Sequence, residues 1–426
     1  MSPQRRRLVF VSAAATAAAT TAPWPARAAT LACPALGAQG EIQLIGNAFP
    51  AIQHIARIAE GCTRPGFKVA FKLTPQARTE TEQAFASEGR SPFDAAVVSM
   101  GVFSNLYSRR QLQPLTDLAR KYQSRYRIEE RMLVRVDGEV LAIAFMQNTQ
   151  NLYYRADLFE KHRLTVPATY AELLHAAEVL KRHEPSVRFP VAQGFGKGFD
   201  SATEFINLLA SLEGRVFQRG TALPAFNGAA GVEAVRLMQS VLPYMTPNAL
   251  ASNADDVMNQ LQQGTAAMGV LWASRASRMD DPAASKVVGR MQFAAAPAAR
   301  PGGRSAAHLW WDGVVMPRNA VLRREATFQV LMEALSEDAV RAGNDLAIWV
   351  RSAYVPGRFG TGVAVAQKAG APVWPSEPFF GLAHGEIGKV LPEALTGART
   401  PQAALDFAAA AYTQAAAEKG FIKAGA

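Results

Sequence analysis

The fold of this 426-residue chain is predicted most directly by residues 151–173, NLYYRADLFEKHRLTVPATYAEL. Near the end of this stretch, Thr169 and Glu172 form a Thr-x-x-Glu capping box, whose side chains bind the free amides at the start of a helix. The apolar residues that follow share one face of that helix: Leu173, Ala176, Ala177 and Leu180. The stretch therefore predicts an amphipathic helix that starts just after Thr169 and packs on a core.

The same alternation of strand, loop and helix continues outward on both sides. Apolar or alternating runs predict strands at 41–46, 67–73, 94–99, 140–145, 266–272 and 291–296. Helices are predicted at 50–61, at 328–335, after a second capping box at Ser201 and Glu204, and from Thr400 with Pro401 in its first position. Such alternation favours an α/β fold with largely parallel sheets, which bind ligands beyond the carboxyl ends of their strands.

Residues 1–29 have the pattern of an export signal. Arg5–Arg7 precede an uncharged, alanine-rich stretch at 8–22, and Ala26-Arg27-Ala28 fits the small-x-small pattern of a cleavage site. The paired arginines loosely match a twin-arginine signal. No later segment is an apolar run long enough to span a membrane. The sequence therefore predicts a mature protein in the periplasm.

The two cysteines, Cys33 and Cys62, fit an oxidising compartment. The predicted helix at 50–61 returns toward the start of the strand at 41–46, so Cys62 can reach the segment that carries Cys33. A disulfide between them is the favoured interpretation. Two free thiols remain the first alternative. A lipid on Cys33 is the second, although the preceding residues lack the leucine that opens a lipoprotein box.

Composition and charge exclude some classes of protein. Hydrophobic residues make up 49% of the chain and charged residues 19%, which is globular composition and excludes a disordered or fibrous chain. Lys and Arg number 45 against 35 Asp and Glu, a formal net charge of +10, and four of the arginines lie in residues 1–29. Because the other basic residues are scattered rather than gathered in a stripe, nucleic-acid binding is not expected.

The chain carries no motif that points to catalysis or to metal binding. Its six histidines lie far apart without the spacing of a metal site, and the cysteines have no metal-binding partner. The G-x-G-x-G run at 194–198 is not a phosphate loop, because Gly198 rather than Ser or Thr follows Lys197. We therefore expect no cofactor, no metal and no enzymatic activity. A secreted enzyme on the same scaffold is the remote alternative.

Four motifs spread over nearly the whole mature chain suggest a family. The first is Asn151–Lys161 with the helix that follows Pro167. The others, in chain order, are the strand at 94–99 with Gln113–Leu118, then Leu261–Trp272, then Leu395–Leu405. Together they resemble the motifs of extracellular solute-binding proteins of ABC importers, of the sugar- or maltose-binding type.

The resemblance implies two α/β lobes with mixed, mostly parallel sheets, joined by three hinge crossings near 145–147, 296–297 and 335–337. The implied division is a signal peptide at 1–29, an N-lobe of 30–145 plus 298–336, and a C-lobe of 146–297 plus 337–426. It also implies a monomer whose lobes close on a small solute, a sugar first of all, and present it to the membrane subunits of an ABC permease.

The residues expected to touch the solute are polar and aromatic side chains near strand ends and crossings. They are Asn47, Phe49, Ser99, Asn148, Trp272, Arg275, Trp310, Trp311, Asp312, Tyr354 and Arg358. Aromatic faces suit the CH groups of a sugar, and Asp, Asn and Arg suit its hydroxyls. Trp272 and Trp311 are expected to face each other across the solute; the alternative for each is a place in the core. Arg275 and Arg358 keep open an anionic solute, such as a phosphorylated polyol.

We expect the exported protein to begin near Ala29 or Thr30, because the cleavage pattern ends at Ala28. N-terminal sequencing of protein taken from the periplasm checks this. A mature chain that keeps residues 1–28, or that carries a lipid on Cys33, contradicts the prediction.

Overall fold

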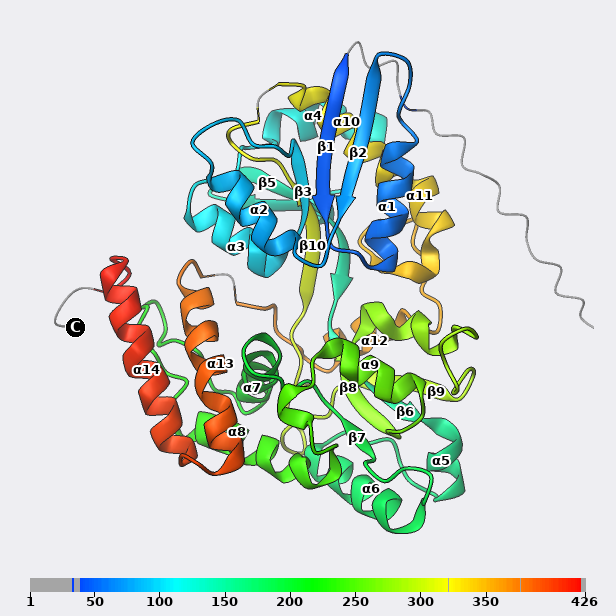
Figure 1. The fold of residues 1–426 in the computed structure, drawn as a ribbon, viewed down its shortest axis with the longest axis vertical. Helices are drawn as coiled ribbons and strands as arrows, with labels where there is room; N and C mark the ends of the chain where they lie inside the picture. Colours follow the sequence, from blue (N-terminus) through cyan, green and yellow to red (C-terminus); the bar gives the residue numbers. More distant parts are fainter. Residues whose placement is uncertain (1–32, 34–38, 321, 376, 423–426) are drawn as a thin grey trace, which may run out of the picture.

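The computed structural model describes residue 33 and residues 39–320, 322–375 and 377–422. The expected signal peptide, 1–29, lies outside the described residues. The chain forms two lobes stacked along the long axis of the molecule (Figure 1). Both lobes are α/β, and each is built from segments that lie far apart in the sequence.

The N-lobe, at the top of Figure 1, contains a seven-stranded sheet in the order β11-β5-β10-β3-β1-β2, with β4 paired to β5. The strands are β1 (Gly40–Gly46), β2 (Phe67–Leu73), β3 (Ala95–Ser99), β4 (Leu133–Val136), β5 (Glu139–Asn148), β10 (Trp310–Val315) and β11 (Ile348–Trp349). One face packs against α1 (Pro50–Glu60), α4 (Thr116–Tyr126), α10 (Arg324–Ala334) and α11 (Glu337–Ala342). The other packs against α2 (Ala77–Ala86) and α3 (Met100–Ser108). Helices therefore cover both faces of the sheet, while Lys68 and Lys72 of the edge strand β2 stay exposed.

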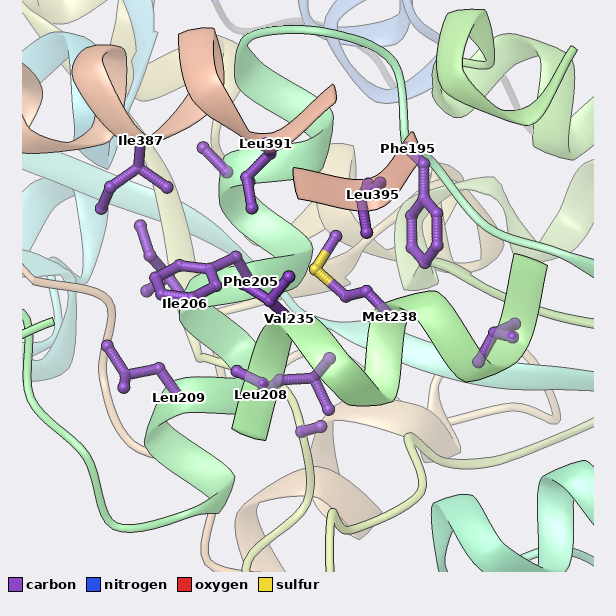
Figure 2. Packing of buried hydrophobic residues seen from close by; sticks show 14 of the residues in the cluster. Phe195, Phe205, Ile206, Leu208, Leu209, Val235, Met238, Ile387, Leu391 and Leu395 are labelled. Carbon is purple, nitrogen blue, oxygen red and sulfur yellow. The ribbon is translucent and has the colours of Figure 1, made fainter. Parts of the chain in front are cut away.

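The C-lobe contains a four-stranded sheet in the order β7-β8-β6-β9. Its strands are β6 (Gln150–Arg155), β7 (Val191–Ala192), β8 (Met268–Trp272) and β9 (Met291–Ala295). Its helices are α5 (Ala156–Lys161), α6 (Tyr170–His183), α7 (Phe199–Ser211), α8 (Ala229–Val241), α9 (Ala254–Gln262), α12 (Thr361–Lys368), α13 (Phe380–Thr396) and α14 (Pro401–Glu418). Figure 2 shows how α7, α8 and α13 interlock through Phe205, Met238 and Leu391. Because α7 is apolar on several faces, it lies inside this lobe rather than on its surface.

Both sheets are mixed. Among the described strands, parallel pairing holds only for β1 with β2 and β3 and for β7 with β8, so the sheets are mixed as expected but not mostly parallel. The other pairs are antiparallel, because β5, β6 and β10 carry the chain between the lobes and run back along their neighbours.

The helix caps follow the sequence patterns in two cases of three. The Thr169 hydroxyl accepts a bond from the Glu172 amide at 3.2 Å, and Thr400 caps α14, whose first residue is Pro401. The capping box expected at Ser201 is wrong. Helix α7 begins earlier, after Gly198 with φ of +98°, a conformation that favours glycine. Glu204 is instead buried and accepts a bond from Gln150 at 2.8 Å.

The first crossing lies where β5 ends at Asn148 and β6 begins at Gln150, within a few residues of the predicted place. The second differs from the predicted 296–297. Ala298 bridges to Thr169 and Leu309 to Val373, both in the C-lobe, so the chain enters the N-lobe sheet only at β10. The pattern of apolar residues located the strand ends but not the sheet that each strand joins.

The third crossing also differs from the predicted 335–337. Helix α11 and strand β11 pack in the N-lobe, where Ile348 pairs with Gln147, and the next helix to pack on the C-lobe sheet is α12. The chain therefore crosses between 350 and 360. The N-lobe extends to about Val350, and residues 298–309 belong to the C-lobe.

Cys33 and Cys62 form a disulfide with a Cα–Cα distance of 5.4 Å. Cys62 follows the end of α1, and its buried side chain belongs to the N-lobe core. The bond therefore attaches the segment before β1 to the first strand–helix unit.

Replacing both cysteines, as Cys33→Ala with Cys62→Ala, is expected to lower the free energy of unfolding by about 3–4 kcal/mol, because a bridge with a sequence separation of 29 restricts the unfolded chain. Urea unfolding of the oxidised wild type and the double variant measures the difference. A reducing agent should lower the stability of the wild type toward that of the variant and leave the stability of the variant unchanged. Equal stability of the oxidised wild type and the variant contradicts the prediction.

Candidate functional site

A cavity of about 360 Å³ lies between the lobes. The N-lobe contributes Asn47, Phe49, Ile52, Pro75, Ala77, Arg78, Thr81, Val97, Val98, Ser99, Gly101, Val102, Ser104 and Asn105 to its lining. The C-lobe contributes Phe199, Trp374, Pro375, Phe380, Gly381 and His384, and β10 contributes Trp310 and Asp312. Its position is the one expected for an α/β site, since β1 and β3 end at this cavity.

Five helices begin at the cavity: α1, α2 and α3 from the N-lobe, and α7 and α13 from the C-lobe. None of the residues just before them makes a side-chain capping bond; these residues are Phe49, Gln76, Ser99, Gly198 and Phe379. The amides of a first helical turn have no partner within the helix and carry the positive end of the helix dipole. Some of these amides already donate within the chain, as Ala77 does to the Thr74 carbonyl at 3.2 Å and Phe380 to the Glu377 carbonyl at 2.9 Å. The cavity wall therefore offers oxygen atoms of a solute the positive helix ends and the remaining first-turn amides.

Three aromatic rings supply apolar faces. Trp310 stacks on Trp374 with ring centroids 4.1 Å apart, and Phe199 lies 6.3 Å from Trp310. Trp272 packs against Trp310 in a T-shaped arrangement with centroids 5.3 Å apart, so it contacts that ring without lining the cavity. The result is a rigid aromatic wall that spans the C-lobe and β10.

Asp312 is the acidic residue on this wall. It lies on β10 opposite Ser99 of β3 and Met146 of β5, and it lines the cavity. Its carboxylate accepts no hydrogen bond and forms no ion pair with any of the described residues. Burial raises the pKa of Asp312 to about 7, from an ordinary value of 3.8.

The basic groups at the cavity do not neutralise this acid. The Arg78 Nε atom lies 3.3 Å from the Glu82 carboxylate, which also accepts a bond from the Asn105 amide at 3.2 Å. Burial, and to a lesser degree the Arg78 charge, lower the pKa of His384 to about 3, so that imidazole is neutral. The cavity therefore holds one carboxylate without a partner and one arginine that already has an acid.

Five of the eleven predicted contact residues line the cavity: Asn47, Phe49, Ser99, Trp310 and Asp312. The other six do not: Asn148, Trp272, Arg275, Trp311, Tyr354 and Arg358. Asn148 instead clasps the two lobes, because its amide group donates to the Ser274 hydroxyl at 3.1 Å and accepts from the Ser274 amide at 3.2 Å.

The expected pair of facing tryptophans is wrong. Successive side chains of a strand point to opposite faces, so Trp310 and Asp312 line the cavity while Trp311 turns away. The Trp311 ring packs on Phe103 of the N-lobe, with centroids 5.1 Å apart. The sequence pattern placed a tryptophan at the right crossing but not on the right face.

The remaining predicted residues have structural partners outside the cavity. Arg275 pairs with Asp255, and Arg358 pairs with Asp280 at 3.2 Å while it covers the Phe359 ring. Tyr354 lines a separate small hollow beside the third crossing. These residues lie near the hinge, but they do not reach the space between the lobes.

Several lining residues were missed: Arg78, Asn105, Phe199, Phe380 and His384. Phe199 follows Gly198, so a search for aromatic residues in glycine-rich loops finds it, as a search of proline-rich segments finds Trp374 in 372–375. Arg78, Asn105 and His384 carry no such signal. They lie on ordinary helices, which reach the cavity only because the two lobes meet.

Within the part of the chain that the structure describes, no group of three or more acidic, histidine or cysteine side chains could hold a metal ion. Over the same residues, no helix combines the length and apolar character of a membrane span.

The family profile described as bacterial extracellular solute-binding protein matches residues 58–339. A Deinococcus radiodurans protein named "Probable ABC transporter-binding protein" is 24% identical over 290 residues. That similarity covers 65% of this chain and 64% of the relative, which is less than two thirds of its length.

Two solved structures show the same fold. One is an ABC transporter solute-binding protein from Agrobacterium radiobacter K84 in complex with ribitol; it has a TM-score of 0.76 and 19% identity, and the match covers 88% of this chain and 98% of the other. The second is maltose-bound MalE3 of T. maritima, with a TM-score of 0.77 and 18% identity over 88% and 99% of the two chains.

The raised pKa of Asp312 predicts a pH-dependent stability. Between its unfolded pKa near 3.8 and its folded pKa near 7, the unfolded state has lost this proton and the folded state keeps it, so stability falls as the pH rises. We expect the free energy of unfolding of Asp312→Asn, relative to that of the ligand-free wild type, to rise between pH 4 and pH 8 by on the order of 4 kcal/mol, because the amide does not titrate. Urea unfolding across this range measures it. Glu204 and Asp200 also have raised pKa values, but they titrate in both proteins, so their contributions cancel in the difference between the two. A difference that does not change with pH contradicts the assignment.

Proposed function

Because the chain belongs to the bacterial extracellular solute-binding protein family, we propose that it is the binding component of an ABC importer and that it holds a sugar or polyol between its lobes. The observation that carries the proposal is the inter-lobe cavity itself, with an aromatic wall, backbone donors and one free carboxylate. No part of this chemistry requires a bond to be made or broken, which supports a binding protein rather than an enzyme.

The lining suits a polyhydroxylated solute. The CH faces of a sugar ring pack on aromatic rings, here Trp310 and Phe199. Hydroxyl oxygens accept bonds from the amides at the helix starts, and hydroxyl hydrogens are donated to Asp312. A cavity of about 360 Å³ is at the small end of ligand sites, which supports a solute of one or two sugar units.

Binding would be coupled to closure of the lobes. Ser99 lies on the N-lobe, Phe199 on the C-lobe, and Trp310 and Asp312 on the strand that connects them. A solute that contacts all of these binds the closed form more tightly than the open form, so it shifts the population toward closure. The closed form would then deliver the solute to the permease. We propose that the protein acts as a monomer in the periplasm after export by its N-terminal signal.

An anionic solute, such as a phosphorylated polyol, is less well supported. Arg275 and Arg358 form ion pairs with Asp255 and Asp280 outside the cavity. Arg78 lines the cavity but is paired with Glu82. An anion would have to approach the Asp312 carboxylate without a free cation to offset the repulsion.

Two neighbouring tryptophans provide a matched test. Trp310→Ala removes an indole ring that lines the cavity. Trp311→Ala removes an identical ring that lies on the opposite face of β10. We expect Trp310→Ala to weaken solute binding by at least about thirtyfold, as for an aromatic hot spot, and Trp311→Ala to change it less than about threefold. Both should lose stability, by up to about 3–5 kcal/mol for the buried Trp310.

The measurement is calorimetric titration with the best binder from a panel that includes ribitol, D-mannitol, maltose and glucose, with each solute assayed for turnover. Equal losses of affinity in the two variants contradict the proposed wall. Turnover of a bound sugar contradicts a purely binding role. Failure of every sugar and polyol to bind contradicts the proposed function.

A further inference from the structure

We propose that the solute carries a protonated amino group that pairs with Asp312, which makes an amino sugar the substrate class of this cavity. The inference rests on the proposed function and narrows it. It starts from the one charged group at the cavity that the described residues leave without a partner.

Among the residues that the structure describes, no cation acts on Asp312. Burial alone accounts for the shift in its pKa, without an opposing contribution from a positive side chain. Arg78 lies close enough to His384 to affect the titration of that ring, and its own partner is Glu82. Ser99 and Met146, opposite Asp312 on the neighbouring strands, are uncharged. When Asp312 ionises, it therefore does so without a positive side chain to pair with it.

An ammonium group on the solute stabilises the ionised Asp312 carboxylate better than a hydroxyl does. A hydrogen bond between two charged groups is about twice as strong as one between neutral groups. A cation also gains from aromatic faces, and Trp310, Trp374 and Phe199 form such a wall beside Asp312. A neutral hydroxyl would leave a buried carboxylate with only dipoles around it, which keeps the cost of its ionisation high.

The rest of the cavity selects a sugar rather than a simple amine. The starts of α2, α3, α7 and α13 direct the positive ends of their helix dipoles at the cavity, which favours oxygen acceptors on the solute. An aliphatic polyamine has no such oxygens, whereas an amino sugar has several hydroxyls beside its ammonium. A uronic acid would satisfy the donors but would be repelled by Asp312.

The test compares sugars that differ only at one substituent. D-glucosamine, D-galactosamine and D-mannosamine are titrated beside the parent hexoses, their N-acetyl derivatives and D-glucuronate, at pH 7.5 by calorimetry. We expect at least one amino sugar to bind ten times or more tightly than its neutral parent. Acetylation, which removes the charge, should abolish that gain, and glucuronate should bind most weakly.

Asp312→Asn and Asp345→Asn are the matched variants. Both replace an acid by its amide, but Asp345 is exposed beside the third crossing, outside the inter-lobe cavity. Asp312→Asn should lower the affinity for the amino sugar at least tenfold and the affinity for its neutral parent less than threefold. Asp345→Asn should change neither affinity.

The remaining outcomes separate the two proposals. If neutral hexoses bind as tightly as amino sugars and Asp312→Asn weakens both equally, Asp312 accepts hydroxyls; the amino-sugar inference is then wrong and the sugar-binding function stands. If an amino sugar binds best but Asp312→Asn leaves its affinity unchanged, the pairing with Asp312 is likewise wrong and the sugar-binding function stands. If no sugar of any charge binds, the proposed function fails as well.

Discussion

The antiparallel pairing of β5 with β10 is the constraint on which the rest of the structure depends. Trp310 pairs with Asn148 at the boundary of the lobes, and Val314 pairs with Ile143 deep in the N-lobe sheet. The same two strands thus carry two of the three crossings side by side. Because strands in a ladder cannot slide by one residue without turning every side chain over, this pairing determines which residues of β10 face the cavity.

A buried polar network holds the C-lobe end of these strands. The Thr149 hydroxyl donates to the His308 carbonyl at 2.9 Å, and the His308 ring donates to Asn207 of α7 at 2.7 Å. Asn207 donates to Gln150, which in turn donates to Glu204. Burial raises the pKa of Glu204 to about 8, so its side chain is largely neutral at pH 7. The segments at both crossings are therefore attached to α7, the helix that begins at the cavity.

The same arrangement explains the unequal chemistry of the two lobes. The N-lobe supplies small and polar groups from the loops after β1 and β3, while the C-lobe supplies most of the aromatic area through Phe199, Trp374 and Phe380. The lobes approach closely at the rim, since a Cβ on Gly381 of α13 would lie 3.1 Å from the Asn105 side chain of α3. Closure thus joins a donor-rich wall to an aromatic wall, with Asp312 between them on the connecting strand.

Local patterns in the sequence were enough for the fold class, most strand positions, the caps at Thr169 and Thr400, and the pairing of Cys33 with Cys62. They depend on contacts close in the chain or on one helical face, so the residues themselves carry the signal. The candidate site was predicted only in part. Asn47, Phe49 and Ser99 follow strand ends, which the sequence shows, and Trp310 and Asp312 lie on a strand whose position it also shows.

Only the tertiary structure decided which face of β10 is turned to the cavity, where the second and third crossings lie, and that Arg78, Asn105 and His384 reach the same space. Each of these depends on pairing between segments that are 100 or more residues apart, such as β5 with β10. The preference for one register over another arises from packing of the whole sheet rather than from any single stretch of residues.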